Sequence, residues 1–335
     1  MADDLAPPRI AGTSRAFAGV LNALRTSVRR LRTNDLQVST ARKVGITLLM
    51  LLPFSAIVFL LRLRHAVKGP ITVDAPATDG LMFECHPPDL IQLYLWVFGI
   101  WEPDITQLVR SRLTSGDVFV DVGANIGYFT LLASGRIGAE GLAVAVEASP
   151  AVFAHLNDSL RRNGEPGNIR TVNMAAAAQA GSLPVYGGPG HNTGLSSTVD
   201  RWGRPRQATV EALPLDEILR QHELSGVRVV KIDVEGGEDE VLAGMTRMLR
   251  EAPPSLEILL ELSPRWWRDK TKRPIDVLRP FLDSGFNVYK VENSYWPWRY
   301  MWPACVRAPR RIRDGLERRD RRIDLVLSRA DSETL

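Results

Sequence analysis

Residues 117–127 hold the clearest chemical signal in the chain, because an acidic residue ends an apolar run just before two glycines. Asp121 precedes Gly123 by two positions, and Gly127 follows four positions later. Glycine lets a backbone turn sharply and approach a ligand, and the free amides of a following helix face the same point. The pattern predicts a small-molecule site at the end of a strand.

The spacing of these glycines bears on which ligand would bind. A dinucleotide-binding turn has the pattern GxGxxG and seats a pyrophosphate on the end of a helix. Here an acid lies beside the first glycine, where it repels phosphate and attracts a cationic amino-acid group. The turn therefore favours S-adenosylmethionine over a nicotinamide cofactor. Asn125, inside the turn, could adopt a left-handed backbone or reach the ligand.

A second acid, Glu147, closes the apolar run 142–146 and lies 24 residues after Gly123. A carboxylate at the end of the neighbouring strand can accept both hydroxyls of a ribose. Nicotinamide enzymes use the same device, so Glu147 alone does not select a cofactor. Asn173 and Ala175 end the next expected strand, where an adenine could lie.

A third group of polar residues, Lys231, Asp233 and Glu235, occupies alternating positions at the end of another apolar run. Alternating side chains project to one side of a strand. Burying an amine and two carboxylates costs free energy unless they pair or bind something. One interpretation is a structural Lys–Asp pair. The other is that the carboxylates orient a substrate hydroxyl or accept its proton.

His191 lies in a glycine-rich segment, 187–194, between two expected strands. A lone histidine in a loop is commonly a surface residue, but this one is also a candidate base for a hydroxyl nucleophile. Glu261 and Glu102 are further candidate acids. The sequence shows no metal-ligand spacing, nucleophile elbow or Walker lysine motif, so we expect no metal.

The elements that would position these residues alternate along the chain after residue 116. Strands are expected at 117–122, 142–147, 168–174, 227–233, 256–262, 286–292 and 323–328. Helices are expected at 104–114, 127–136, 150–163, 214–222, 237–250 and 274–284. This alternation predicts a parallel sheet with helices on both faces and a ligand at the carboxyl ends of the strands. The last two strands could form a hairpin, and 184–207 is expected to be a long functional loop.

Three segments, 117–128, 146–150 and 231–236, together resemble the FkbM family of S-adenosylmethionine-dependent methyltransferases. The resemblance covers about 90–330. It implies an α/β class I methyltransferase fold, which is a Rossmann-like, seven-stranded and mostly parallel sheet whose last strand is antiparallel. This chain adds an N-terminal helical or apolar extension.

The resemblance also implies a reaction, the O-methylation of a hydroxyl on a sugar, polyketide or lipid-linked metabolite by in-line transfer with a general base. The methionine part of the cofactor is expected beside Asp121, Gly123, Asn125 and Gly127. Glu147 is expected at the ribose, and the base is expected among His191, Asp233 and Glu235. The alternatives are a catalytically silent, membrane-tethered binding protein of the same fold and, less favoured without GxGxxG, a nicotinamide oxidoreductase.

Composition narrows the class of partner. Of 335 residues, 45% are hydrophobic and 24% charged, with a formal net charge of +4. Basic residues crowd 9–43 and 299–322 without the aromatic interleaving of a nucleic-acid groove, so a solvated face or an anionic membrane is expected instead. Two distant cysteines favour a reducing, cytoplasmic setting. The aromatic run 295–302 could pack under a loop, line a substrate wall or contact a membrane.

The segment 44–61 complicates a purely cytoplasmic interpretation, because it carries no charge over 18 residues. That length is the lower limit for a membrane span, and basic residues flank both ends, so no orientation follows. A buried helix or one lying in the membrane interface is the alternative. We expect a basic, partly disordered segment at 1–43, an apolar helix and candidate anchor at 44–68, a cap at 69–116 and the catalytic domain at 117–335.

Overall fold

The computed structural model describes residues 9–31, 39–69, 71–87, 89–188, 196–200, 203–301, 307–313, 316 and 322–335. The chain divides into two compact units. Unit 1 comprises Met1–Thr106 and Asn293–Val306, and unit 2 comprises Gln107–Glu292 and Arg307–Leu335. Nothing in the sequence predicted that residues 293–306 belong with the N-terminal part of the chain.

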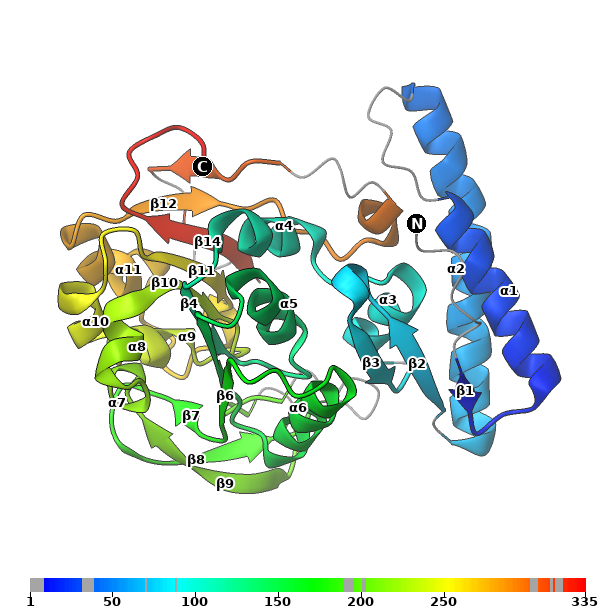
Figure 1. Ribbon diagram of the computed structural model, residues 1–335, viewed down its shortest axis with the longest axis horizontal. Helices are drawn as coiled ribbons and strands as arrows, with labels where there is room; N and C mark the ends of the chain where they lie inside the picture. Colours follow the sequence, from blue (N-terminus) through cyan, green and yellow to red (C-terminus); the bar gives the residue numbers. More distant parts are fainter. Residues whose placement is uncertain are drawn as a thin grey trace. The chain divides into compact units, whose positions relative to one another are not determined.

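Unit 2 is built on one large sheet (Figure 1), whose strand order is β13-β12-β14-β11-β10-β4-β5-β6. The strands are β4 (Val118–Val122), β5 (Leu142–Val146), β6 (Ile169–Val172), β10 (Val227–Ile232), β11 (Glu257–Leu262), β12 (Asn287–Lys290), β13 (Arg310–Ile312) and β14 (Ile323–Ser328). All seven expected strands are present, and β13 adds an eighth at the edge. The chain-terminal strand β14 is antiparallel to both β11 and β12, as expected.

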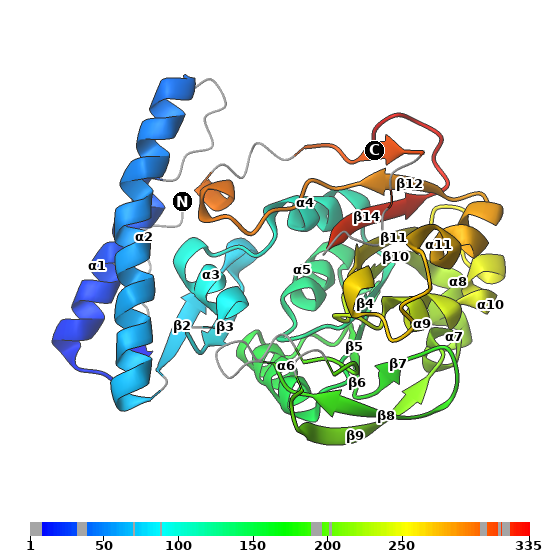
Figure 2. The ribbon, with the colours of Figure 1, turned by 180° about the vertical axis from the view of Figure 1, so that it is seen from behind.

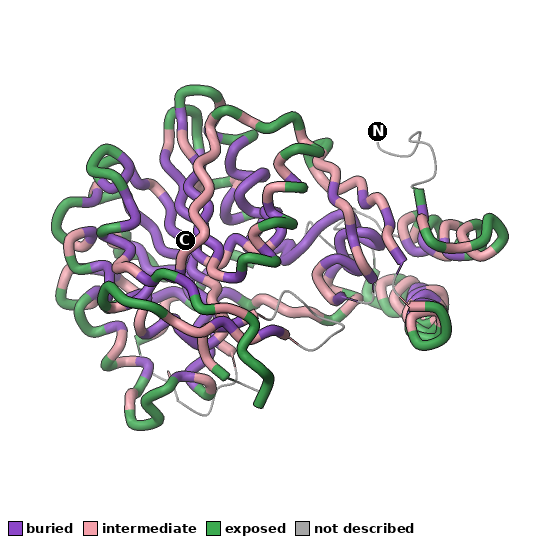
Figure 3. Tube along the Cα trace, turned by 90° about the horizontal axis from the view of Figure 1, so that it is seen from below, coloured by how far each residue is buried: buried purple, intermediate pink, exposed green. Residues whose placement is uncertain are grey.

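Alternation along the central strands decides which side chains reach which face of the sheet. Val120 of β4 and Val144 of β5 lie in the main hydrophobic core, and so does Ile232 of β10. Asp121 and Lys231 occupy the intervening positions and therefore point to the opposite face. Figure 3 shows the trace coloured by burial, and all five residues of β4 are buried. In β4, β5 and β10 the sheet thus presents an acid and an amine on one face and apolar residues on the other.

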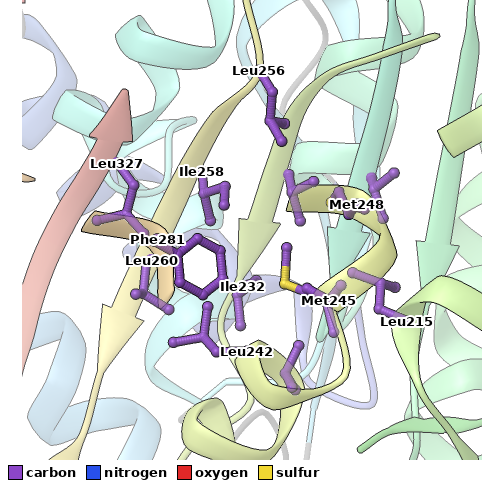
Figure 4. Packing of buried hydrophobic residues seen from close by; sticks show 14 of the residues in the cluster. Leu215, Ile232, Leu242, Met245, Met248, Leu256, Ile258, Leu260, Phe281 and Leu327 are labelled. Atoms are coloured by element: carbon purple, nitrogen blue, oxygen red, sulfur yellow. The ribbon is translucent and has the colours of Figure 1, made fainter. Parts of the chain in front are cut away.

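Helices cover both faces of the sheet. On one side lie α5 (Tyr128–Ile137) and α6 (Pro150–Arg162), with Leu156 of α6 against Ala145 of β5. The other side carries α7 (Leu215–Ile218), α8 (Gln221–Gly226), α9 (Glu238–Ala243), α10 (Thr246–Glu251) and α11 (Pro274–Asp283). Figure 4 shows the core beneath them, where Met245 and Phe281 pack against Ile232 and Leu260.

Two expected helices are each two shorter helices in the structure. The segment 214–222 contains α7 and the start of α8, and the segment 237–250 contains α9 and α10. Gly244 separates the second pair, and a Cβ there would lie 2.2 Å from the carbonyl oxygen of Ala177. Residue 244 is therefore restricted to glycine, because a neighbouring backbone passes too close for a side chain.

The expected loop at 184–207 is wrong at both ends. The strands β8 (Gly181–Tyr186) and β9 (Arg206–Leu213) form an antiparallel pair. A short strand, β7 (Ala175–Ala176), joins them in a separate sheet of order β7-β9-β8. Pro184 sits opposite Thr209 in this pair. The glycine and proline content of β8 concealed a strand, since both residues are uncommon inside sheets.

Unit 1 combines two helices at its N-terminal end with a small sheet. The helices are α1 (Arg15–Leu31) and α2 (Thr40–Lys68), which pack on each other (Figure 2). The sheet contains β1 (Ile10–Ala11), β2 (Thr72–Pro76) and β3 (Met82–Cys85), the last two forming an antiparallel hairpin. The remaining elements are η1 (Thr78–Gly80), α3 (Leu90–Phe98), η4 (Pro297–Met301) and the start of α4 (Pro103–Arg112).

The helix α1 was not expected within the segment predicted to be partly disordered. Leu21, Arg25 and Val28 recur at helical spacing and are its buried residues. Arg25 Nε donates to the carbonyl of Trp96 at 2.6 Å, and Arg29 Nε donates to that of Val97 at 2.9 Å. These carbonyls belong to the last turn of α3, where helical partners are lacking. Arginines that looked like a solvated charge run therefore fix α1 to α3.

Candidate active site

The glycine turn after β4 has the conformation that its residues suggest. Gly123, Asn125 and Gly127 all have positive φ, of 82°, 52° and 85°. A Cβ on Gly123 would lie 1.9 Å from the carbonyl oxygen of Asp233, and one on Gly127 would lie 2.5 Å from Leu156 Cδ1. Close approach of the Asp233 backbone therefore requires glycine at 123, and the positive φ favours glycine at 127. The left-handed backbone at Asn125 agrees with the first of its two interpretations.

Asp121 lies at the end of β4 with 1% of its surface exposed. Thr130 Oγ1 donates to its Oδ2 at 2.7 Å. Its Oδ1 is buried and has no hydrogen-bond partner among the residues that the structure describes. Burial raises the pKa of Asp121, and the nearby Lys231 opposes that rise. The turn thus begins at a carboxylate with one unsatisfied acceptor.

Glu147, at the end of β5, is tied to the same turn. Its Oε2 accepts a hydrogen bond from the backbone N–H of Asn125 at 3.0 Å, and its Oε1 accepts one from that of Ser149 at 2.8 Å. Burial raises its pKa to about 7 in spite of these two hydrogen bonds, which favour the charged form. Each carboxylate oxygen keeps a further lone pair for a ligand hydroxyl.

Asn173 lies beside Glu147, because it follows β6, the strand that pairs with β5. Its Nδ2 donates to the carbonyl oxygens of Glu147 at 2.8 Å and Ala148 at 3.2 Å. The side chain therefore braces the backbone that follows β5. This contact positions Glu147, while the expected contact between Asn173 and an adenine stays a prediction.

Three carboxylates converge at the ends of β10 and β11. Oxygens of Asp233, Glu235 and Glu261 all lie within 4.8 Å of one another. Lys231 Nζ lies 3.0 Å from Asp233 Oδ2 and 4.8 Å from the ring centroid of Phe129. The Lys–Asp pair foreseen as a structural alternative is therefore present, and Asp233 is at the same time part of an acidic cluster.

Glu261 is the most perturbed member of this cluster. Burial raises its pKa well above the ordinary value, and the negative charges of Asp233, Asp324 and Glu235 raise it further. Arg322 opposes the shift, with Nη1 at 3.8 Å from Glu261 Oε2. Burial and the neighbouring negative charges both favour the protonated form of Glu261 over the charged form. The sequence showed no dense ligand spacing because these acids come from two strands.

The segment after β10 is held by residues that the sequence analysis missed. Glu238 is fully buried and accepts hydrogen bonds from the backbone N–H of Gly236 at 2.6 Å and from Trp267 Nε1 at 2.8 Å. Burial raises its pKa to about 7. Ser197 Oγ donates to the carbonyl of Glu235 at 2.9 Å. These contacts fix Glu235, whose φ is 59°, and only the tertiary structure reveals them.

Two candidates named from the sequence, His191 and Glu102, remain. His191 lies outside the part of the chain that the structure describes. Glu102 belongs to unit 1, where it accepts hydrogen bonds from Asn293 Nδ2 at 2.7 Å and Tyr295 Oη at 2.9 Å. In the aromatic run, Tyr300 is buried and packs on aromatic rings of α3, whereas Trp296 is exposed.

Comparison with known proteins bears on what such a site does. A family model described as "Methyltransferase FkbM domain" matches residues 121–292, just over half of the chain. The chain is 27% identical over 154 residues to "Hexuronic acid methyltransferase AglP" of Haloferax volcanii, covering 44% of this chain and 58% of that protein. It is 25% identical over 216 residues to "Methyltransferase sdnD" of Sordaria araneosa, covering 56% of this chain and 80% of that protein.

Solved structures give weaker likenesses. The crystal structure of methyltransferase FkbM from Methylobacillus flagellatus is 14% identical, with a TM-score of 0.40, over 88% of this chain and 63% of that one. Fibrillarin from Aeropyrum pernix, solved with S-adenosyl-L-methionine, is 16% identical, with a TM-score of 0.36, over 78% of this chain and 94% of that one. The fold assignment therefore rests on the strand order and the family match.

Proposed function

The chain belongs to the FkbM methyltransferase family, and from this premise we propose that it methylates a hydroxyl oxygen of a sugar, polyketide or lipid-linked metabolite. The family makes the chain an S-adenosylmethionine-dependent methyltransferase of class I fold. The finer proposal of a hydroxyl acceptor is supported by one observation, the cluster of Asp233, Glu235 and Glu261. This cluster is the proton acceptor that hydroxyl methylation needs.

The residues around the glycine turn fit the cofactor that the family implies. Asp121 Oδ1 is a buried acceptor without a partner in the described residues, and it suits the cationic end of an amino acid. Glu147 offers two oxygens with spare lone pairs, and these suit the vicinal hydroxyls of a ribose. When bound, S-adenosylmethionine supplies a methyl group on a sulfonium, which is a good leaving group.

The protein's part in the reaction is to position the acceptor and to remove a proton. The acceptor hydroxyl gives its proton to a carboxylate of the cluster as its oxygen forms a bond to the methyl carbon. The cofactor would supply a neutral thioether as the leaving group as this bond forms. Lys231 Nζ lies 3.0 Å from Asp233 Oδ2 and holds the Asp233 carboxylate in place. The raised pKa of Glu261 suits the Glu261 carboxylate to receive a proton.

The cluster also bears on the kind of oxygen that is methylated. A hexuronic acid, named in the description of one relative, carries both hydroxyls and a carboxylate. A carboxylate acceptor needs no base, and its charge would be repelled by three neighbouring acids. A hydroxyl needs a base and carries no charge. The arrangement therefore favours ether formation on a hydroxyl over ester formation on a carboxylate.

The proposal can be tested with S-adenosylmethionine labelled in the methyl group and a panel of sugars, uronic acids and polyketide alcohols. We expect transfer to a hydroxylated acceptor, a base-stable product and undiminished turnover in EDTA. Glu261→Gln and Asp233→Asn should each lower kcat by about a hundredfold or more, since general base catalysis contributes on that order. Glu140→Gln, at an exposed position of unit 2, is the matched control and should leave kcat unchanged.

Two outcomes would contradict the proposal. A product that loses its label in mild base would be an ester and would place the transfer on a carboxylate. Binding of the cofactor without transfer to any acceptor, with the fold intact, would favour the catalytically silent alternative.

A further inference from the structure

The helix α2 has two opposite faces with different surroundings. Met50, Phe54, Ile57 and Leu61 form its buried face at spacings of four, three and four residues. Leu52 and Phe59 each lie two positions after a buried residue, about 160° around the helix from it. They are 74% and 65% exposed. With Val44, Leu48, Leu49, Leu63 and Val67 they form an exposed apolar stripe along the helix.

The buried face of α2 rests on protein. Phe54 stacks against Phe98 at 5.6 Å between ring centroids and meets Tyr94 at 5.9 Å, both on α3. Buried Asp89 caps the N-terminus of that helix, and Arg25 and Arg29 bind its C-terminal carbonyls. The helix that covers the middle of α2 is therefore α3, and charged side chains lie at both of its ends.

This packing decides between the ways in which an apolar helix can meet a membrane. By length and composition α2 could cross a bilayer, and only 22% of its most apolar window is buried. If it crossed, α3 would enter the hydrocarbon with the charges at its two ends, which costs several kcal/mol per charge. A helix lying in the interface plane instead gives its stripe to the lipid and keeps α3 on the aqueous side.

The charge around the stripe fits a lipid surface of opposite sign. Residues 9–69 contain eleven arginines and lysines and a single acid, Asp35. Arg42 and Lys43 precede the stripe, and Arg62 and Lys68 lie near its other end. Basic residues at both ends are what an in-plane helix needs on an anionic membrane, since both ends lie at the headgroups.

A cavity at the C-terminal end of the stripe is likewise lined by apolar and basic side chains. It has a volume of about 600 Å³ and lies between α2 and the start of α1. Phe17, Leu60, Leu63 and Val67 supply apolar walls, and Arg64 and Lys68 supply two cations. An acyl chain beside an anionic headgroup matches this combination.

We propose that α2 is an in-plane anchor whose exposed stripe inserts into one leaflet of an anionic membrane without spanning it. The occupant of the stripe is a lipid bilayer, and neither a second copy of the chain nor solvent covers it. This inference does not depend on the identity of the methyl acceptor.

The first test is sedimentation of the purified full chain with vesicles of phosphatidylcholine, with and without phosphatidylglycerol. We expect binding that needs the anionic lipid and weakens with salt. Leu52→Glu with Phe59→Glu should weaken it roughly a hundredfold or more, because each buried side chain contributes at least about a power of ten. Ser182→Glu with Thr209→Glu, at exposed sites in unit 2, adds equal charge and should retain binding.

The second test separates an in-plane helix from a spanning one. Ala41→Cys and Ala66→Cys place thiols at exposed positions near the two ends of α2, in a chain carrying Cys305→Ser. In membranes of expressing cells, a membrane-impermeant maleimide should label both thiols from the same side. Labelling from opposite sides would establish a span and overturn the proposal.

Two further results would also overturn it. One is a chain that stays in the supernatant with anionic vesicles at low salt. The other is a chain that self-associates in buffer and becomes monomeric on Leu52→Glu without ever binding vesicles, which would assign the stripe to a second copy. Circular dichroism and S-adenosylmethionine binding in unit 2 show that each variant is folded.

Discussion

At the scale of single residues, Glu147 has a structural role in the fold and is also the acid that we propose binds the cofactor. Glu147 binds the backbone amides of Asn125 and Ser149, so it links the glycine turn to the end of β5. The same carboxylate is the expected acceptor for the ribose. Its pKa of about 7 places its titration within the range in which enzymes are assayed.

Glu147 predicts a pH dependence of cofactor binding. Its pKa in the free protein lies above the ordinary value of 4.5, so the carboxylate gains a proton as the pH falls through 7. A protonated group accepts hydroxyls poorly, and affinity should fall about tenfold for each pH unit below 7. Isothermal titration of S-adenosylmethionine between pH 6 and 8.5 measures this. Glu147→Gln should bind weakly with a flatter profile, and Glu140→Gln should behave as wild type. Equal affinity at pH 6 and pH 8 in the wild-type chain would rule out this role for Glu147.

At the scale of elements, the ends of β4 and β10 are built as one piece. The backbone N–H of Asp233 donates to the carbonyl of Val122 at 3.0 Å, and the Asp233 carbonyl fills the space that Gly123 leaves open. The glycine turn after β4 and the acidic cluster are therefore held together by backbone contacts. A distortion of the glycine turn should therefore also displace the acidic cluster.

Substitution of Gly123 tests this coupling. A Cβ there would lie 1.9 Å from a carbonyl oxygen on a backbone with φ of 82°, so Gly123→Ala should destabilise unit 2 by about 3 kcal/mol or more. Gly135→Ala is the matched control, since Gly135 lies inside α5 with no atom within 4 Å of the added carbon. The control should be neutral or stabilise the chain by up to about 1 kcal/mol. Urea unfolding measures both, and a Gly123→Ala variant as stable as the control would show that the turn can move.

At the scale of the whole molecule, every described residue assigned to cofactor or proton transfer lies in unit 2. The apolar stripe of α2 lies in unit 1. The two tasks that we propose, methyl transfer and attachment to a membrane surface, thus belong to separate compact units.

This division predicts which segments a bound ligand protects from amide hydrogen exchange. Saturating S-adenosylmethionine should slow amide hydrogen exchange in β4–α5, β5–α6 and the end of β10, because a ligand bound at 100 times its Kd stabilises its unit by about 2.7 kcal/mol. Exchange in α1 and α2 should change little. Mass spectrometry of peptic fragments measures both, with S-adenosylmethionine omitted as the control. Protection confined to α1 and α2 would place the site elsewhere.

Sequence alone determined much of unit 2, because its signals are local. Alternating apolar runs predicted all seven main strands, and the spacing of Asp121, Gly123 and Gly127 predicted the glycine turn that follows β4. Local patterns failed where a neighbour far along the chain decides the conformation. Gly244 is one example, since the backbone of Ala177 leaves no room there for a side chain. The strand hidden at 181–186 is another, since its partner β9 stabilises it.

Tertiary structure alone decided which acids meet. Asp233 and Glu261 lie 28 residues apart in the sequence, yet parallel pairing of β10 with β11 brings their carboxylates into one cluster. Only the fold could show that α2 has one covered face, since its sequence is apolar on every side. Sequence fixes what each segment prefers by itself, whereas burial, charge proximity and pKa depend on distances between segments, which exist only once the chain has folded.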